Sequence, residues 1–190
     1  IDSHEEIAVS PEDDVEVRRT TLANYSSDTR VIDVTSFAEV VLNTPAADEA
    51  HPAFSKLFIE TELLPDRNAI ICSRRPRARG EQPPCLFHLM LLQGEETGRA
   101  SFETDRAQFL GRGRDAAAPM AMETPTLSNS QGSVLDPAIA IRRTVTLKPG
   151  QSARITLVTG SALTRPALIA LIEKYQDQSI ADRVFELAWT

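Results

Sequence analysis

The residues whose types could bind a metal ion are Cys72, Cys85 and His88. On a strand, a spacing of three points the side chains of Cys85 and His88 to opposite faces. A structural zinc site also needs a fourth ligand, and no residue is spaced to supply it. Free cysteines are common in buried strands. We therefore expect two free thiols, close together if their strands are antiparallel neighbours, and no metal site.

Three aspartates could take part in glycoside chemistry, which uses a pair of carboxylates. Asp105, Asp115 and Asp136 all fall in expected loops or at expected strand ends, and Asp136-Pro137 is typical of the turn that enters a strand. The sequence has no Gly-x-Ser-x-Gly motif, no nucleotide fingerprint and no histidine paired with a nucleophile. We therefore expect no catalytic set in this chain.

Two runs of charge could bind ions or partners. Residues 1–16 contain seven acids and no Lys or Arg, but Glu12-Asp13-Asp14 lacks the spacing of a calcium loop and predicts a turn before the next strand. Arg74, Arg75, Arg77 and Arg79 form the densest basic run. We expect a solvated connection between two apolar strands. The alternative is a contact with an anion or an acidic partner, such as the acidic N-terminal strand of a neighbouring molecule.

The elements that position these residues are mostly strands, because apolar and polar residues alternate with period two over much of the chain. Predicted strands cover residues 15–21, 32–42, 57–64, 69–73, 85–92, 139–147 and 154–159. Residues 65–68 predict a reverse turn with Pro at the second position when the turn is counted from Leu64. Residues 148–151 predict another, with Pro149 second and Gly150 suited to a type II turn. Residues 111–133, rich in Gly, Ala, Pro and Ser, form the longest irregular stretch, which is typical of a docking loop.

The period changes to that of a helix after Gly160. Thr164 and Pro166 predict the start of one helix. Ser179 and Asp182 resemble a capping box that opens a second helix, whose apolar residues cover much of its circumference: Ile180, Val184, Phe185, Leu187 and Trp189. Such a helix needs partners, so we expect both helices to belong to the next domain.

Composition agrees with one ordinary soluble domain of 190 residues, 42% hydrophobic and 25% charged. No stretch approaches the roughly 18 apolar residues of a membrane span. Outside residues 1–16 the chain carries 20 acids and 20 bases, which argues against a nucleic-acid-binding protein. Two cysteines favour a reducing compartment. A start at Ile1 without a signal peptide, and an end at Thr190 inside an expected helix, indicate a segment of a larger protein.

Several blocks in a fixed order resemble one enzyme family, the cyclic β-1,2-glucan synthases, large bacterial inner-membrane enzymes. The blocks are VSPEDDVEVRRT (residues 9–20), TSFAEVVL (35–42), AHPAF (50–54), FETDRAQFLGRGR (102–114), LSN (127–129), GSVLDP (132–137), EKY (173–175) and FELAWT (185–190). The similar region of the family is its carboxy-terminal part, which is related to cellobiose phosphorylase, of glycoside hydrolase family 94.

The resemblance implies a mostly β fold: a β-sandwich of the supersandwich, galactose-mutarotase-like type, followed by two C-terminal helices. The sandwich would cover residues 1–160 and lack its first strands, and residues 161–190 would be linker helices that lead to an absent α/α barrel. In the family, the Asp general acid and inorganic phosphate belong to that barrel. The resemblance therefore assigns no catalytic residue, metal or cofactor to this chain.

The best positional match to a sandwich loop near the active site or a subunit contact is residues 105–114. We expect Arg106, Arg112 and Arg114 to contact the barrel, a neighbouring subunit or glucan. The alternative for these arginines is a set of salt bridges that anchor the loop.

The leading hypothesis is a non-catalytic sandwich segment of a cyclic β-1,2-glucan synthase-like transferase or phosphorylase. Its partners would be the rest of the parent chain, with β-1,2-glucan and a second copy as further candidates, and no nucleic acid or direct membrane contact. The chain would be soluble, within a parent anchored at the cytoplasmic face of the bacterial inner membrane. The alternatives are a carbohydrate-binding module for β-glucan, disfavoured by only ten aromatic residues, and an epimerase, which would need a His beside a carboxylate.

Overall fold

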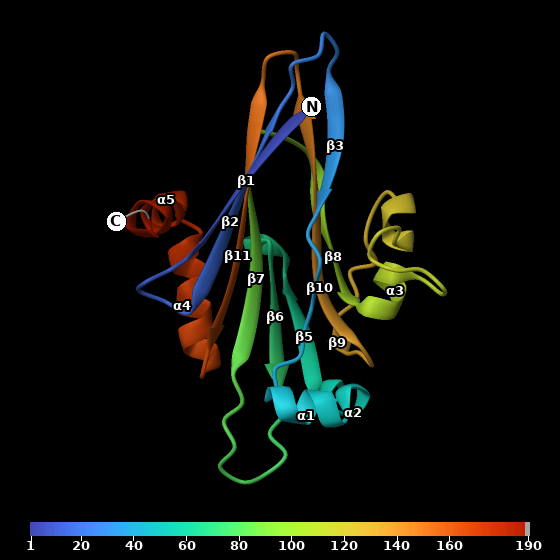
Figure 1. Ribbon diagram of the computed structural model, residues 1–190, viewed down its shortest axis with the longest axis vertical. Coiled ribbons are helices and arrows are strands. Elements are labelled where there is room, and N and C mark those ends of the chain that lie inside the picture. The colour runs from blue at the N-terminus through green and yellow to red at the C-terminus, as the bar shows by residue number, and fades with distance from the viewer. Residues whose placement is uncertain (189–190) are drawn as a thin grey trace.

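The period-two segments form two stacked β-sheets in a computed structural model, which describes residues 1–188 (Figure 1). The larger sheet has seven strands in the order β1-β2-β11-β7-β6-β5-β9. Their bounds are Asp2–Val9 (β1), Val15–Ala23 (β2), Ser152–Ala162 (β11), Cys85–Gln93 (β7), Ala69–Arg74 (β6), Ile59–Leu64 (β5) and Gly132–Ser133 (β9). The mostly β sandwich expected from the sequence is confirmed.

The smaller sheet is built around β10 (Pro137–Leu147). Strand β8 (Glu95–Asp105) pairs with β10, and β3 (Arg30–Thr35) and β4 (Ala38–Glu39) pair with it in succession. Short helices lie in the connections between strands: α1 (Pro45–Ala50), α2 (Pro52–Lys56), η1 (Pro65–Arg67), α3 (Arg106–Leu110) and η2 (Met120–Glu123).

Alternation along each strand divides the apolar residues between separate clusters. In β7, Leu86 and Met90 face the space between the two sheets, whereas Phe87 and Leu89 face the outer side of the larger sheet. A third cluster, which includes Phe109, lies on the outer side of the smaller sheet. The continuous apolar run of β7 is therefore buried on both faces, as predicted.

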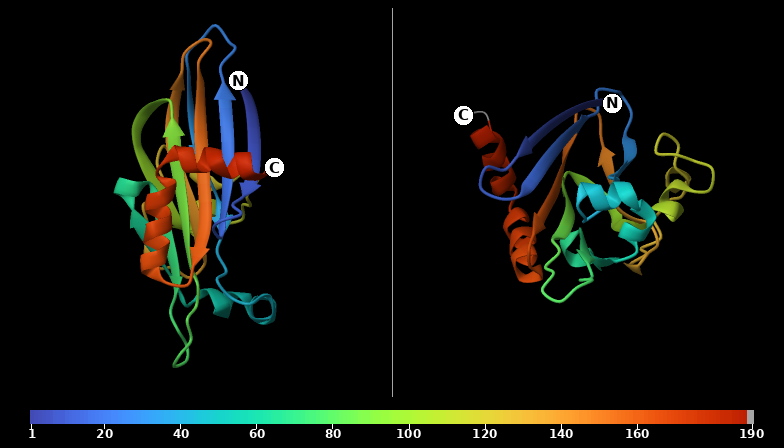
Figure 2. Two further views of the ribbon diagram at one scale, coloured as in Figure 1. Left: turned by 90° about the vertical axis from the view of Figure 1, so that its left-hand side faces the viewer. Right: turned by 60° about the horizontal axis from the view of Figure 1, so that its bottom comes forward.

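Two helices cover the outer face of the larger sheet, α4 (Arg165–Tyr175) and α5 (Gln178–Ala188) (Figure 2). Thr164 caps α4 as predicted, because its hydroxyl accepts the N–H of Ala167. The predicted capping box of α5 is wrong by two residues. The carboxylate of Asp177 accepts the N–H of Ser179 at 2.9 Å. Hydrogen bonds from the side chain and then the backbone of Ser179 lower the pKa of Asp177.

The apolar face of α5 differs from the predicted one. Ala181, Val184 and Phe185 are buried, with Ile180 beside them, but Leu187 is 40% exposed. Trp189 lies outside the described residues. The helices thus share a core with the sandwich, and their role as linkers to a further domain stays a prediction.

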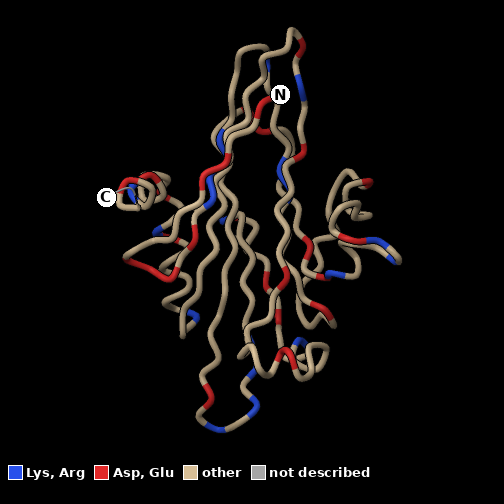
Figure 3. The backbone as a smooth tube through the Cα atoms, in the orientation of Figure 1, with Lys and Arg blue, Asp and Glu red and all other residues tan. Residues whose placement is uncertain are grey.

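The acidic turn between β1 and β2 lies beside the C-terminal helices (Figure 3), and its side chains form ion pairs with them. Asp13, in the turn between β1 and β2, accepts hydrogen bonds from Lys174 Nζ at 2.7 Å and from Tyr175 Oη at 3.0 Å. Glu12 pairs with Arg183, and burial raises the pKa of Tyr175 to about 12. The turn predicted at Glu12-Asp13-Asp14 therefore holds α4 and α5 against the sheet.

Three strand predictions are corrected. The predicted strand over residues 32–42 divides into β3 and β4, which keep one register against β10. Phe37, between them, stacks on Phe109 at 4.3 Å between ring centroids. Gly150 has the positive φ (+78°) expected of the turn, but β10 and β11 on either side of it belong to different sheets. The predicted strands did not include β1, which pairs with β2 along its whole length.

Candidate functional site

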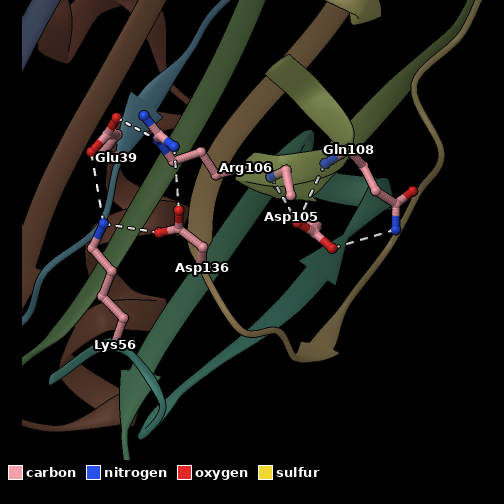
Figure 4. Close-up of polar contacts among 7 residues, drawn as sticks. Glu39, Lys56, Asp105, Arg106, Gln108 and Asp136 are labelled. Atoms are coloured by element: carbon pink, nitrogen blue, oxygen red, sulfur yellow. Dashed lines mark hydrogen bonds and ion pairs between the residues drawn. The ribbon is translucent and has the colours of Figure 1, made fainter. Parts of the chain in front are cut away.

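The best sequence match to a functional loop begins where β8 ends and α3 starts. Asp105 is the N-cap of α3: its carboxylate accepts the N–H of Ala107 at 2.8 Å and that of Gln108 at 3.4 Å (Figure 4). An acid in this position satisfies the unpaired donors of the first helical turn. Asp105 therefore fixes the direction of α3 and the place of Arg106.

Four charged side chains from distant parts of the chain form an ion cluster: Glu39, Lys56, Arg106 and Asp136 (Figure 4). Arg106 Nε lies 2.6 Å from Glu39, and Arg106 Nη1 lies 3.4 Å from Asp136. Lys56 Nζ lies 2.8 Å from Asp136 and 3.8 Å from Glu39. Each cation bridges both acids, so the cluster is neutral and joins α2, α3, β4 and the start of β10.

The charges of the ion cluster are arranged to stabilise the structure and not to catalyse a reaction. The hydrogen bond to Glu39 raises the pKa of Arg106. Side-chain exposure ranges from 14% for Lys56 to 45% for Glu39, so solvent screens part of each attraction. General acid and base catalysis needs two carboxyl groups that face one substrate, whereas here the two cations lie between Glu39 and Asp136.

Asp136→Asn is expected to lower the free energy of unfolding by about 1 kcal/mol, because the substitution removes the charge that both Lys56 and Arg106 face while keeping its shape. Urea denaturation measures the change. Glu62→Gln is the matched control, since Glu62 makes one exposed pair with Arg165. A loss for Asp136→Asn no larger than that of the control would contradict a cooperative cluster.

Residues 111–131, here called the anchored segment, cover the outer face of the smaller sheet. Their main anchor is Arg142 of β10, which is 3% exposed. Its guanidinium donates to the carbonyl oxygens of Ala121 at 2.7 Å and Thr124 at 2.5 Å, and to the hydroxyl of Thr35 at 2.8 Å. Burial lowers the pKa of Arg142. One buried cation thus fixes the middle of a long irregular stretch.

The C-terminal end of the anchored segment is held by the buried carboxylate of Glu103. It accepts hydrogen bonds from Ser128 Oγ at 2.6 Å and from Ser130 Oγ, as well as the backbone N–H groups of Thr104 and Asp105 at 3.0 Å each. Both oxygens of this buried carboxylate therefore have hydrogen-bond donors. The anchored segment is therefore a pre-shaped surface despite its lack of regular structure.

The three predicted site residues do not converge on one point. Arg106 belongs to the ion cluster, and Arg114 forms a two-pronged pair with Glu123 of η2, which raises the pKa of Arg114. The side chain of Arg112 is exposed and has no hydrogen bond or ion pair within residues 1–188. Contact of these arginines with a barrel, a subunit or glucan stays a prediction.

Several polar residues at the site were missed, namely Glu39, Lys56, Glu103 and Arg142. The adjacent arginines Arg142 and Arg143 inside the apolar run of β10 were the available signal, since charges in a strand buried on both faces must have partners. Arg143 faces the other way and pairs with Glu96, and its Nη1 donates to the carbonyl of Met90 at 3.0 Å.

The cysteines lie on neighbouring antiparallel strands, since Ser73 pairs with Cys85, so the condition set for their closeness is met. Cys72 faces the interior of the sandwich and Cys85 packs toward α4, so the two thiols point to opposite faces. Burial raises the pKa of Cys72 to about 12. Within residues 1–188, no group of three or more His, Cys, Asp or Glu side chains could hold a metal ion, and no helix is long and apolar enough to cross a membrane.

Residues 1–178 match the family model described as glycosyl hydrolase 94, supersandwich domain. The chain belongs to this family. It is also 35% identical, over 189 residues, to the cyclic β-(1,2)-glucan synthase NdvB of Rhizobium meliloti (strain 1021). That match covers 99% of this chain and 7% of the relative, so the supersandwich domain spans a small part of that protein's length.

The match to the glucan synthase confirms the resemblance that the sequence blocks indicated. It covers the ion cluster, the anchored segment and both C-terminal helices of the supersandwich domain. The family match ends at residue 178, where α5 begins.

Proposed function

We propose that this supersandwich domain is a non-catalytic support for a carbohydrate-active domain of a cyclic β-1,2-glucan synthase-like enzyme. The proposal draws on family membership and on the name of the relative. The observation that carries it is the attachment of the anchored segment, whose middle is fixed by the buried Arg142 and whose C-terminal end is fixed by the buried Glu103. A surface that is ordered before contact loses little entropy when a partner docks on it.

The roles of the acids near this surface support the same proposal. Asp105 caps α3, Asp136 joins two cations, and Glu103 is satisfied by four donors. Each carboxylate is thus committed to holding the fold. The partner would be an α/α barrel of the parent chain that supplies the general acid and binds inorganic phosphate, and a second copy of the domain could share the surface.

A carbohydrate-binding module for β-glucan is the second candidate. Sugar-binding sandwiches offer flat aromatic faces, and here Phe37 stacks on Phe109, while the rings of Phe54 and Phe58 are both approached by the guanidinium of Arg77. These rings contact other side chains of the domain, whereas Tyr25 is 80% exposed and Phe54 47% exposed. As part of such a parent, the domain would act at the cytoplasmic face of the bacterial inner membrane.

The chain incubated with β-1,2-gluco-oligosaccharides and inorganic phosphate is expected to release no glucose 1-phosphate above a protein-free blank. A glycoside phosphorylase added to the same mixture is the positive control. Release of glucose 1-phosphate by the chain in proportion to its concentration would overturn the non-catalytic role.

A further inference from the structure

A cavity of about 390 Å³ opens between the two sheets where β3 gives way to β4. Residues 36–38 line it from the smaller sheet, and residues of β1, β2, β7 and β11 line it from the larger sheet. The volume lies in the range of small-molecule sites, roughly 300–1,000 Å³. The residues that give the cavity its chemistry are Glu5, Glu16, Arg18, Phe37, His88 and Thr159.

A row of paired residues crosses the floor of this cavity. Glu16 of β2 pairs with Thr159 of β11, which pairs in turn with His88 of β7. Residues that pair directly across strands lie on the same face of a sheet. Farther along the same face of the sheet, the residues are apolar and pack in the sandwich core, namely Leu22, Met90 and Ile155. The inner face of the larger sheet therefore changes from apolar to polar where the cavity opens.

His88 links this polar row to the opposite sheet. Its ring nitrogens lie 2.8 Å from Thr159 Oγ1 and 2.8 Å from Ser36 Oγ, and the residue is 4% exposed. Ser36 Oγ also accepts the N–H of Ile141 at 3.1 Å. An apolar residue would fill this position with less desolvation cost. The buried chain of Ser36, His88 and Thr159 instead brings hydrogen-bonding groups to the wall of the cavity.

The charges around the cavity select the class of ligand. Glu5 and Glu16 supply acceptors, and Arg18, whose Nε is held by Glu16 at 2.7 Å, keeps its Nη groups as donors. With His88 neutral, the two acids outweigh the one cation, and an anion is disfavoured. Leu157 and Ala38 add an apolar wall. Acceptors, donors and an apolar wall side by side suit a molecule with many hydroxyl groups and C–H faces.

We propose that this cavity binds a neutral polyhydroxylated ligand, one or two sugar rings in size, with its hydroxyls on Glu16, Arg18 and Thr159. The site lies apart from the anchored segment and goes beyond the proposed function, because a supporting domain does not need to bind sugar. Exposed Ile7 and Val9, which pair with Arg18 and Glu16 and so share their face, extend the apolar margin of the site along β1.

The test is titration of the full chain with glucose and with a β-1,2-linked glucose disaccharide, followed by calorimetry and by amide NMR shifts. We expect saturable binding with a millimolar or lower Kd and shifts at Thr159 and His88. Ala38→Trp, at an exposed position on the cavity wall, should weaken binding at least tenfold by filling the space. Glu16→Gln should weaken it by a similar factor.

Matched controls separate a specific site from a general effect. Ala116→Trp, at an exposed position in the anchored segment, and Glu62→Gln should each leave the Kd within twofold. Absence of saturable binding of either sugar would overturn the proposal, and so would binding that Ala38→Trp leaves unchanged. Glucose 1-phosphate should bind more weakly than glucose, and tighter binding would contradict the assigned charge. None of these outcomes changes the expected result of the phosphorolysis assay.

Discussion

Arg142→Met is expected to lower the free energy of unfolding by about 3 kcal/mol and to loosen the anchored segment. Methionine has a similar length but donates no hydrogen bond, so the carbonyls of Ala121 and Thr124 and the hydroxyl of Thr35 lose their donor. A buried polar group left without a partner costs roughly 1–3 kcal/mol. Urea denaturation measures the loss of stability, and amide hydrogen exchange within residues 111–131 measures the loosening.

Arg154→Met is the matched control for this substitution. Arg154 is 42% exposed and makes one ion pair of 3.7 Å with Asp182, so its loss should cost less than about 1 kcal/mol. Exchange in the anchored segment should not change in the control. If Arg142→Met costs no more than Arg154→Met, or if exchange in the segment stays slow, Arg142 is not its anchor.

His88 is expected to make the domain less stable in mild acid. Burial lowers the pKa of His88 from 6.5 to about 4 in the folded chain. The unfolded chain therefore binds more protons between these two values, and stability rises with pH through this window. The loss of unfolding free energy due to His88 is absent above pH 6.5 and grows as the pH drops toward 4. It amounts to about 3 kcal/mol over this window.

Comparison with His88→Gln isolates this effect, because glutamine can still contact Ser36 and Thr159 but does not titrate. Carboxylates titrate in both proteins, so the measured quantity is the difference in unfolding free energy between them at pH 7 and at pH 4. Wild type should lose about 3 kcal/mol more than the variant. His51→Gln, at an exposed position, should follow wild type. Parallel curves for wild type and His88→Gln would show that burial of His88 does not carry this cost.

The sequence predicted the strands well because alternation is a local property that burial on one face imposes on neighbouring residues. The apolar run of β7 and the turn at Gly150 were both confirmed. Partner strands were less predictable. A tight turn with Pro and Gly indicates a hairpin, but here it links two sheets, since the pattern of side chains does not specify the neighbour with which a strand pairs.

The candidate site was also predictable only in part: the residue could be found from the sequence, but its partners could not. Arg106 could be selected from its place in a family-like block, but its partners could not. Lys56 and Asp136 are 80 residues apart, and Glu39 and Arg106 are 67 apart. Only the stacking of the sheets and the placement of α2 and α3 bring them together. The alternative given for the arginines, salt bridges that hold the loop, describes Arg106 and Arg114 as they stand in the structure.

The sequence by itself determined the mostly β fold, the change to helices after residue 160 and the family, because each is encoded in residues close together or in ordered blocks. The tertiary structure decided which charges meet, how residues 111–131 are fixed to the sheet, and where the inner face turns polar at His88. Those features depend on contacts between segments far apart in the chain, and their geometry exists only after the two sheets have packed.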